Sequence, residues 1–310
     1  MSYKNDHQDK IDFSKIYSYS KLELFDQCPK AYHFTYLDPV YSKMKGKLRK
    51  EPQNIWFFYT LGKAIHDALT LYFHLPKDQK TIKGLKEQLQ ISWRSEAMFS
   101  KLPPLGKWGG FKSIEEERSI YKEALQMLLN FKKGFNEKAK IYYLPTNNLN
   151  RSIEDYKKLI KPISKDYDIS GKFDLILKED STLGNDKDSD SLVVVDFKTG
   201  KREESSIFQL KFYKLLGELN FKQLIKKASF YYLKTGRIKE FDLSKEDKND
   251  IKNLVLEKIE KIKAEKKFKT KPSKLCQYCL FRQFCPAKEE IKKYIGPQED
   301  QEDIIDDLPF

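Results

Sequence analysis

The 310-residue chain contains four cysteines, and their spacing is typical of a metal centre. Three of them, Cys276, Cys279 and Cys285, form the pattern C-x2-C-x5-C and are followed by a proline. The fourth, Cys28, lies far upstream and is also followed by a proline. Thiolates in this arrangement are typical ligands of a [4Fe–4S] cluster. With Cys28 as the fourth ligand, such a cluster would hold the two ends of one domain together.

Other interpretations of the same thiols stay open. Structural zinc sites also use four cysteines, although they usually pair two short Cys motifs, and here one half is the single Cys28. Disulfides suit secreted proteins, but the first ten residues are polar and lack the apolar stretch of a signal peptide. No apolar run is long enough to span a bilayer. We therefore expect a cytoplasmic protein with no membrane partner.

A second set of chemical groups lies near the middle of the chain, around a predicted β-hairpin. Asp196 and Lys198 end one strand, and residues two apart on a strand share a face. Asp174, on the other strand, can lie opposite them. Two carboxylates suit Mg²⁺ or Mn²⁺, and an ammonium group complements the charge of a phosphate. Taken alone, the pattern is weak, because any exposed hairpin can carry such residues.

Four further residues accompany this set, and each also has a purely structural interpretation. His66 lies in a predicted amphipathic helix, where a histidine is more often a core residue than a ligand. Glu154 could simply begin a helix. Gln209 and Tyr213 form an i, i+4 pair and so face the same side of a helix, although Tyr213 could be part of the core.

In their order along the chain, these motifs resemble the PD-(D/E)XK nuclease superfamily, specifically its RecB-like branch. The resemblance covers most of the chain, from about Ser18 to Pro286. It is closest to the iron–sulfur nucleases, namely the subunits of AddAB-type recombination nucleases and the CRISPR-adaptation exonuclease. The matching segments are Ser20–Pro29, Gly62 to His66, Gly171 to Asp174, Asp196-x-Lys198, Gln209-x3-Tyr213 and the final three cysteines.

The resemblance implies a divalent-metal site with four ligands in this chain. They would be the side chains of His66, Asp174 and Asp196 and the backbone carbonyl of Phe197. One departure is that many relatives have glutamate where this chain has Asp196. A shorter acid still binds metal, but the change leaves the number of metal ions open.

The same resemblance implies catalytic roles for four other side chains. Lys198 would orient the attacking water or stabilise the charge that develops on the phosphate. Glu154 would be an accessory acid near the metal. Gln209 and Tyr213 would support the site and contact the nucleic-acid backbone.

Hydrophobic periodicity indicates which elements position these residues. Helices are predicted from about Ser18, over Leu61–Phe73, 81–100, 113–140, 206–219 and 244–266, and strands over Tyr167–Lys178, Ser191–Lys198 and Ala228–Lys234. This order predicts an α/β fold. Together with the resemblance, it indicates a restriction-endonuclease-like core, in which helices flank a mixed sheet, with a helical N-terminal half and a C-terminal Cys cluster.

We expect one nuclease domain over residues 14–296, followed by an acidic tail. Within it, residues 14–150 would be mostly helical, 151–243 would form the catalytic α/β core, and 244–296 would form a helix and the iron–sulfur clip. The tail, 297–310, has six acids and no base, and such a composition predicts disorder. The whole chain carries a net charge of +13, which favours a polyanionic partner.

These features predict a metal-dependent DNA nuclease, in particular a single-strand exonuclease of DNA repair or recombination. The chain has no G-x4-G-K-[ST] motor loop, so it would act on single strands or DNA ends, or with a helicase partner. Asp303–Phe310 resembles the acidic tip of bacterial single-stranded-DNA-binding proteins and predicts docking onto repair proteins that recognise that tip. A non-catalytic DNA-binding scaffold and a CRISPR-adaptation nuclease are the alternatives.

Overall fold

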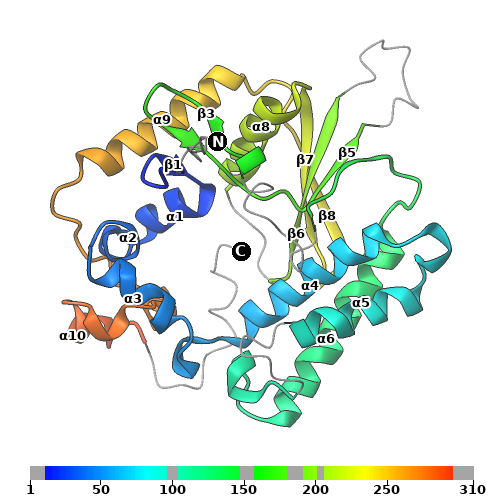
Figure 1. Cartoon of the computed structure of the whole chain (residues 1–310), viewed down its shortest axis with the longest axis horizontal. Coiled ribbons are helices and arrows are strands. Elements are labelled where there is room, and N and C mark those ends of the chain that lie inside the picture. The colour runs from blue at the N-terminus through cyan, green and yellow to red at the C-terminus, as the bar shows by residue number, and fades with distance from the viewer. Residues whose placement is uncertain (1–10, 96–103, 147–156, 180–190, 201–205, 296–310) are drawn as a thin grey trace, which may run out of the picture.

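A five-stranded mixed sheet forms the centre of the protein. The computed structural model describes residues 11–95, 104–146, 157–179, 191–200 and 206–295. The strands lie in the order β2 (Ile141–Tyr143), β5 (Leu175–Lys178), β6 (Leu192–Lys198), β7 (Ile225–Tyr232) and β8 (Arg237–Asp242). Within this sheet, as far as the structure describes it, β6 and β7 are the one parallel pair. Helix α8 (Phe208–Phe221) makes the crossover that a parallel pair requires (Figure 1).

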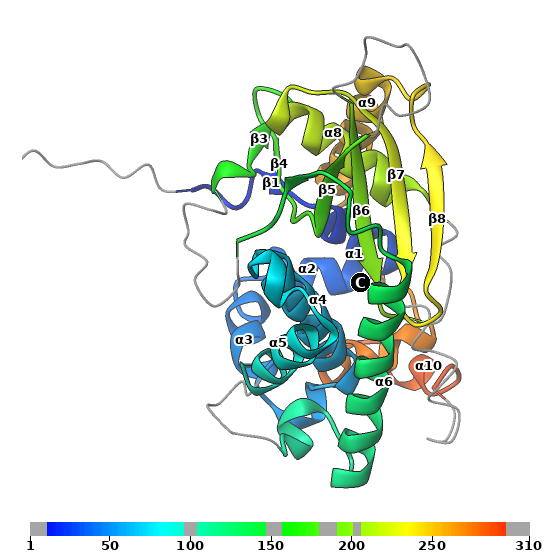
Figure 2. The same cartoon turned by 90° about the vertical axis from the view of Figure 1, so that its right-hand side faces the viewer.

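The central strand β6 is buried on both faces, as its run of valines predicts. Leu192 and Val194 belong to one hydrophobic core, whereas Val195 and Phe197 belong to another. Because side chains alternate along a strand, the sheet separates these two cores. Helices α8 and α9 (Lys248–Ala264) lie on one side of the sheet (Figures 1 and 2). On the other side lie α4 (Phe57–His74), α5 (Ile82–Ser95) and α6 (Ile114–Gly134).

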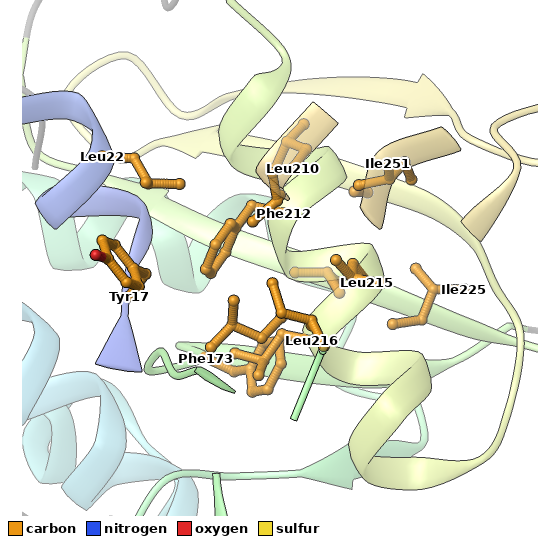
Figure 3. Close-up of a cluster of buried hydrophobic side chains, with 14 of the residues drawn as sticks. Tyr17, Leu22, Phe173, Leu210, Phe212, Leu215, Leu216, Ile225 and Ile251 are labelled. Carbon is orange, nitrogen blue, oxygen red and sulfur yellow. The ribbon is translucent and has the colours of Figure 1, made fainter. Parts of the chain in front are cut away.

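The first core joins α8, α9 and the N-terminal helix α1 (Tyr19–Gln27) to the sheet. Leu210, Phe212, Leu215 and Leu216 of α8 are fully buried in it (Figure 3). Polar caps fix where its helices begin: Ser18 Oγ accepts from Lys21 N at the start of α1, and Asp247 accepts from Asn249 N and Asp250 N at the start of α9.

The second core packs three helices against the other face of the sheet. They are α4 (Phe57–His74), α5 (Ile82–Ser95) and α6 (Ile114–Gly134). Buried residues of α4 recur at helical spacing, as at Leu61, Ile65 and Ala68. Phe131 of α6 packs edge-on against Phe197 of β6, with ring centroids 5.8 Å apart. This helical layer holds α4 against the end of β6.

The two ends of the described chain meet in a third, smaller core. It contains Phe34 of α2 (Pro29–Tyr36), Leu48 of α3 (Tyr41–Leu48) and Phe281. Phe281 lies between two short 3-10 helices, η5 (Lys274–Tyr278) and η6 (Arg282–Phe284), and α10 (Lys288–Ile291) follows them. The Phe34 and Phe281 ring centroids are 5.6 Å apart.

One strand of the predicted hairpin is interrupted. We expect a continuous strand over Tyr167–Lys178, but the structure has β4 (Asp168–Ile169) and β5, separated by an irregular segment. β4 belongs to a separate sheet, between β1 (Ile16–Tyr17) and β3 (Lys161–Pro162). The two segments pair with different strands, β4 with β1 and β3 and β5 with β2 and β6. Gly171, between them, packs closely against α8, where a Cβ atom would lie 2.8 Å from Leu216 Cδ2.

Sequence periodicity also misplaces several element ends. The predicted helix over 113–140 ends at Gly134, and the predicted helix over 81–100 is seen as α5, with residues 96–103 outside the described part. The edge strands β2 and β8 are not expected from the sequence, because β2 is three residues long and β8 is mostly exposed and charged. In the described part of the chain, no helix is both long and apolar enough to cross a membrane.

Candidate active site

Asp196 and Lys198 lie at the end of β6 and face the same side of the sheet. Both side chains are buried, and Lys198 Nζ is 3.2 Å from Asp196 Oδ2. The pair shares its face with Val194, as the alternation of the strand requires. A buried charge pair costs desolvation free energy, so it needs further polar partners to be held in place.

Gln209, in the first turn of α8, supplies those partners. Its Nε2 donates to Asp196 Oδ1 at 3.1 Å, and its Oε1 accepts from Lys198 Nζ at 2.7 Å. The buried amide therefore contacts both charged groups at once and fixes their relative position. Lys198 Nζ also lies 4.9 Å from the centre of the Phe230 ring.

Asp174 reaches the same end of the sheet from the segment just before β5. Its Oδ2 accepts from the backbone N–H of Phe197 at 2.9 Å, and its Oδ1 lies 2.8 Å from Nδ1 of His66. His66 comes from α4, on the opposite side of the sheet from α8. At Gly62, one turn earlier in α4, a Cβ atom would lie 3.4 Å from Thr199 Oγ1, so the helix runs close to the end of β6.

His66 and Asp174 stabilise each other's charged forms. Burial alone would lower the pKa of His66, but the charge and hydrogen bond of Asp174 outweigh it and raise that pKa. Burial alone would raise the pKa of Asp174. His66, the Phe197 N–H and the charge of Lys172 together lower it instead.

Asp196 behaves in the opposite way. Burial raises its pKa to about 6, the charge of Lys198 opposes the rise, and the nearby Asp174 adds to it. Asp196 Oδ2 is buried, and among the described residues its polar contact is the ion pair with Lys198 Nζ at 3.2 Å. A carboxylate oxygen has more than one acceptor site, so this atom is also available to a cation.

The donors present fit a divalent metal ion, although they do not enclose one as they stand. In the described residues, no three His, Cys, Asp or Glu side chains are close enough together to hold a metal ion. His66 Nδ1 and Asp174 Oδ1 lie 2.8 Å apart as a hydrogen-bonded pair. Carboxylate oxygens suit Mg²⁺ or Mn²⁺, whereas an imidazole is a ligand typical of transition metals.

The remaining predicted site residues have different outcomes. Tyr213 is packed against Phe173 with ring centroids 5.5 Å apart, and burial followed by the charges of Asp196 and Asp174 raises its pKa, so its hydroxyl stays protonated beside the carboxylates. The ligand role of the Phe197 carbonyl stays a prediction. Glu154 lies outside the described residues.

All four cysteines line a single cavity of about 600 Å³. Cys28 follows the last residue of α1, and the other three lie in or next to η5 and η6. They are free thiols, and Ser273 N donates to Cys276 Sγ at 3.3 Å. Burial raises the pKa of Cys279 to about 12, and the other three cysteines add to this effect.

Contacts between distant segments hold Cys28 next to the C-terminal motif. Lys258 of α9 pairs with Asp26 at 2.5 Å, and Lys30 N donates to the carbonyl of Lys269 at 3.2 Å. The two segments that carry the cysteines therefore lie together, and their joint binding of a cluster stays a prediction. The thiols surround one cavity and fit a four-sulfur centre in chemistry, but as they stand no three are close enough to hold an ion.

A mixed α/β sheet with two acids and a lysine at one end of its central strands is the architecture of a restriction-endonuclease-like protein. The profile of the PD-(D/E)XK nuclease superfamily matches residues 16–286. The chain belongs to this superfamily, and its members are nucleases. No curated protein matches the chain.

Two features of the site are not predicted from the sequence. One is the hydrogen bond from Phe197 N to Asp174, which depends on how β5 and β6 align. The other is Lys172, whose charge acts on both His66 and Asp174. The one sequence signal for Lys172 is its position two residues before Asp174 in the predicted strand, which indicates that it lies near the site.

Proposed function

We propose that the protein is a metal-dependent deoxyribonuclease that degrades single-stranded DNA from an end, in DNA repair or recombination. The observation that carries the proposal is the hydrogen-bonded set of Asp196, Lys198 and Gln209 beside the His66–Asp174 pair. Lys198 is buried beside Asp196 at the end of β6, and buried acids with shifted pKa values cluster at functional sites. The net charge of +13 supports a nucleic-acid substrate.

His66, Asp174 and Asp196 would hold a Mg²⁺ or Mn²⁺ ion, with the Phe197 carbonyl as a further ligand. Such an ion, when bound, polarises a phosphate oxygen and lowers the pKa of a water. Lys198 then places a fixed positive charge where negative charge develops on the phosphate, and Gln209 keeps the ammonium group in that position. Burial of the set excludes bulk water, which strengthens these interactions.

Digestion of end-labelled single strands by anaerobically purified protein tests the proposal. Wild-type protein with Mn²⁺ should degrade the strand, and Lys198→Ala should be slower by roughly 10²- to 10³-fold, the usual cost of losing one group that stabilises transition-state charge. Lys178→Ala, which removes an exposed lysine from the far end of β5, is the matched control and should be unchanged. Equal activity of wild type and Lys198→Ala would contradict the proposal. DNA binding with no cleavage would favour a scaffold instead.

We further propose that Cys28, Cys276, Cys279 and Cys285 bind a [4Fe–4S] cluster that supports the fold. The shared cavity of the four thiols supports this assignment. Iron and sulfide analysis of the anaerobic protein should give four of each per chain, as a [4Fe–4S] cluster requires. Zinc in their place would show that the site is a structural zinc centre.

Asp303–Phe310 lies outside the described residues, and its role is proposed from its sequence alone. An apolar side chain with flanking acids suits a basic-rimmed apolar pocket on a partner protein. Deletion of Asp303–Phe310 should abolish pull-down of repair proteins that bind the tip of single-stranded-DNA-binding proteins. Unchanged pull-down and unchanged DNA affinity would exclude this partner.

A further inference from the structure

A cavity of about 630 Å³ next to the candidate active site has the lining of an anion site. Gln209 and Tyr213 form part of its wall, so it adjoins the carboxylates. Three lysines, Lys21, Lys45 and Lys172, also line it, and no Asp or Glu does so among the described residues. Such an excess of positive charge, in a chain that also has 46 acids, selects for a negatively charged ligand.

Among the three lysines of this cavity, Lys172 lies nearest in sequence to Asp174. It is two residues before Asp174 in the irregular segment that leads into β5, and its side chain is partly exposed. Its charge acts on Asp174 and on His66, as described above. Lys172 therefore faces the cavity while its charge still reaches the candidate metal site.

The other two lysines occupy places where a positive charge is costly. Lys21 Nζ donates to the carbonyl of Ile16 at 2.9 Å and lies 4.3 Å from the centre of the Tyr17 ring. Burial, followed by the charges of Lys263 and Lys45, lowers the pKa of Lys21 to about 8. A bound anion would offset this repulsion.

Aromatic and hydroxyl groups complete the lining and indicate which kind of anion fits. Tyr19, Tyr36 and Tyr143 lie around the cavity together with Ser18 and Ser20. Single-stranded nucleic acids are bound by this combination, because basic groups track the phosphates and aromatic rings stack on the bases. A free phosphate would use the lysines but not the rings.

We infer that this cavity is a subsite for the backbone of the substrate strand, and that Lys172 contacts the phosphate next to the one that is cleaved. The inference deepens the proposed function and rests on it for the identity of the cleaved phosphate. Lys21 and Lys45 would contact phosphates further along the same strand. Lys172 is then a substrate-binding residue in addition to the predicted set.

Oligonucleotides that carry one neutral methylphosphonate at successive positions test the inference. Affinity is measured without divalent metal, so that binding does not depend on cleavage. In wild-type protein, one position next to the cleavage point should lose roughly 10- to 100-fold in affinity, about the effect of one lost contact to a charged group. Lys172→Ala should bind the unmodified strand with the same loss and be insensitive to the methylphosphonate at that position. For Lys172→Ala, the plot of log binding constant against log salt concentration should have a slope smaller in magnitude by about 1.

Lys172→Arg should restore most of the affinity, because it keeps the charge, and Lys178→Ala should match wild type. Additive losses from Lys172→Ala and the methylphosphonate at every position would overturn the inference. So would a wild-type affinity and salt slope for Lys172→Ala. If wild-type protein binds as expected but cleaves no strand with Mn²⁺, the proposed function fails while the strand subsite stands.

Discussion

Asp174, directly before β5, and His66, on α4, meet with 2.8 Å between Oδ1 and Nδ1, although 108 residues separate them. The same carboxylate accepts the backbone N–H of Phe197, which lies between Asp196 and Lys198. Asp174 therefore connects the helix of the N-terminal half to the strand that carries the other acid. A substitution at this residue affects both halves of the site.

Replacement of Gln209 by Leu tests the amide bridge. The variant keeps the side-chain size but removes both hydrogen bonds to charged groups, so Lys198 and Asp196 lose their fixed position. Each such bond contributes about 1.5–3 kcal/mol, so kcat should fall by roughly 10- to 100-fold with little change in KM. Gln88→Leu, at a buried amide of α5 on the other side of the sheet, is the control. Equal kinetics for both variants would show that the bridge does not position the site.

Stability of the metal-free protein should decrease as the pH rises through the site pKa values. Asp196 has a folded pKa of about 6, above its ordinary 3.8, so it favours the folded state at acidic pH and loses this contribution as the pH rises through about 6. The raised pKa of His66 acts in the same direction, with its contribution lost as the pH passes above its ordinary 6.5. For Asp196 the free energy of unfolding should fall by about 3 kcal/mol at most.

The lowered pKa of Asp174 has the opposite pH dependence, because it stabilises the folded state at higher pH. That contribution is lost only as the pH falls below the ordinary 3.8 of an aspartate.

Saturating Mn²⁺ should therefore raise the melting temperature more at pH 8 than at pH 5.5, because the ion binds the deprotonated groups. Thermal unfolding with and without Mn²⁺ at the two pH values measures the difference. His66→Gln should remove most of the Mn²⁺-dependent increase at pH 8. An increase that is the same at both pH values, or is retained in His66→Gln, would place the metal elsewhere.

A buried ion pair on α8, away from the candidate site, should contribute strongly to stability. Lys214 Nζ lies 2.6 Å from Glu218 Oε1 and donates to the carbonyl of Ile225 at 2.7 Å. Lys214→Met leaves Glu218 buried without its counter-charge, so the free energy of unfolding should fall by about 3–5 kcal/mol. Urea unfolding measures this change. Lys83→Met, at an exposed i, i+4 pair, should change it by less than about 0.5 kcal/mol, and similar losses for both would contradict the prediction.

Cys28 should be needed for the metal centre as much as the three clustered cysteines. Cys28→Ser and Cys285→Ser should each lose most of the bound iron and melt at a lower temperature, because metal binding and folding are coupled. Iron analysis and thermal unfolding of anaerobic samples measure both effects. Iron retained in Cys28→Ser but lost in Cys285→Ser would show that Cys28 is not a ligand.

The sequence predicts the elements that carry the site better than it predicts their boundaries. The valine run of β6, the amphipathic pattern of α4 and the i, i+4 pair on α8 are local signals, and all three elements are present. The predicted continuous strand over Tyr167–Lys178 is wrong because β4 and β5 belong to different sheets, which local periodicity does not reveal. The edge strand β2 is not predicted because it has only three residues, and β8 is not predicted because most of its residues are exposed and charged.

The sequence by itself determined which chemical groups are present, which of them share a strand or helix face, and that the chain belongs to the PD-(D/E)XK nuclease superfamily. Only the tertiary structure decided that His66 reaches Asp174, that Gln209 joins Asp196 to Lys198, and that Lys172 faces a basic cavity. The physical reason is that local periodicity reports which face of an element is buried. Contacts between distant residues depend on how those faces pack, and packing involves the whole fold.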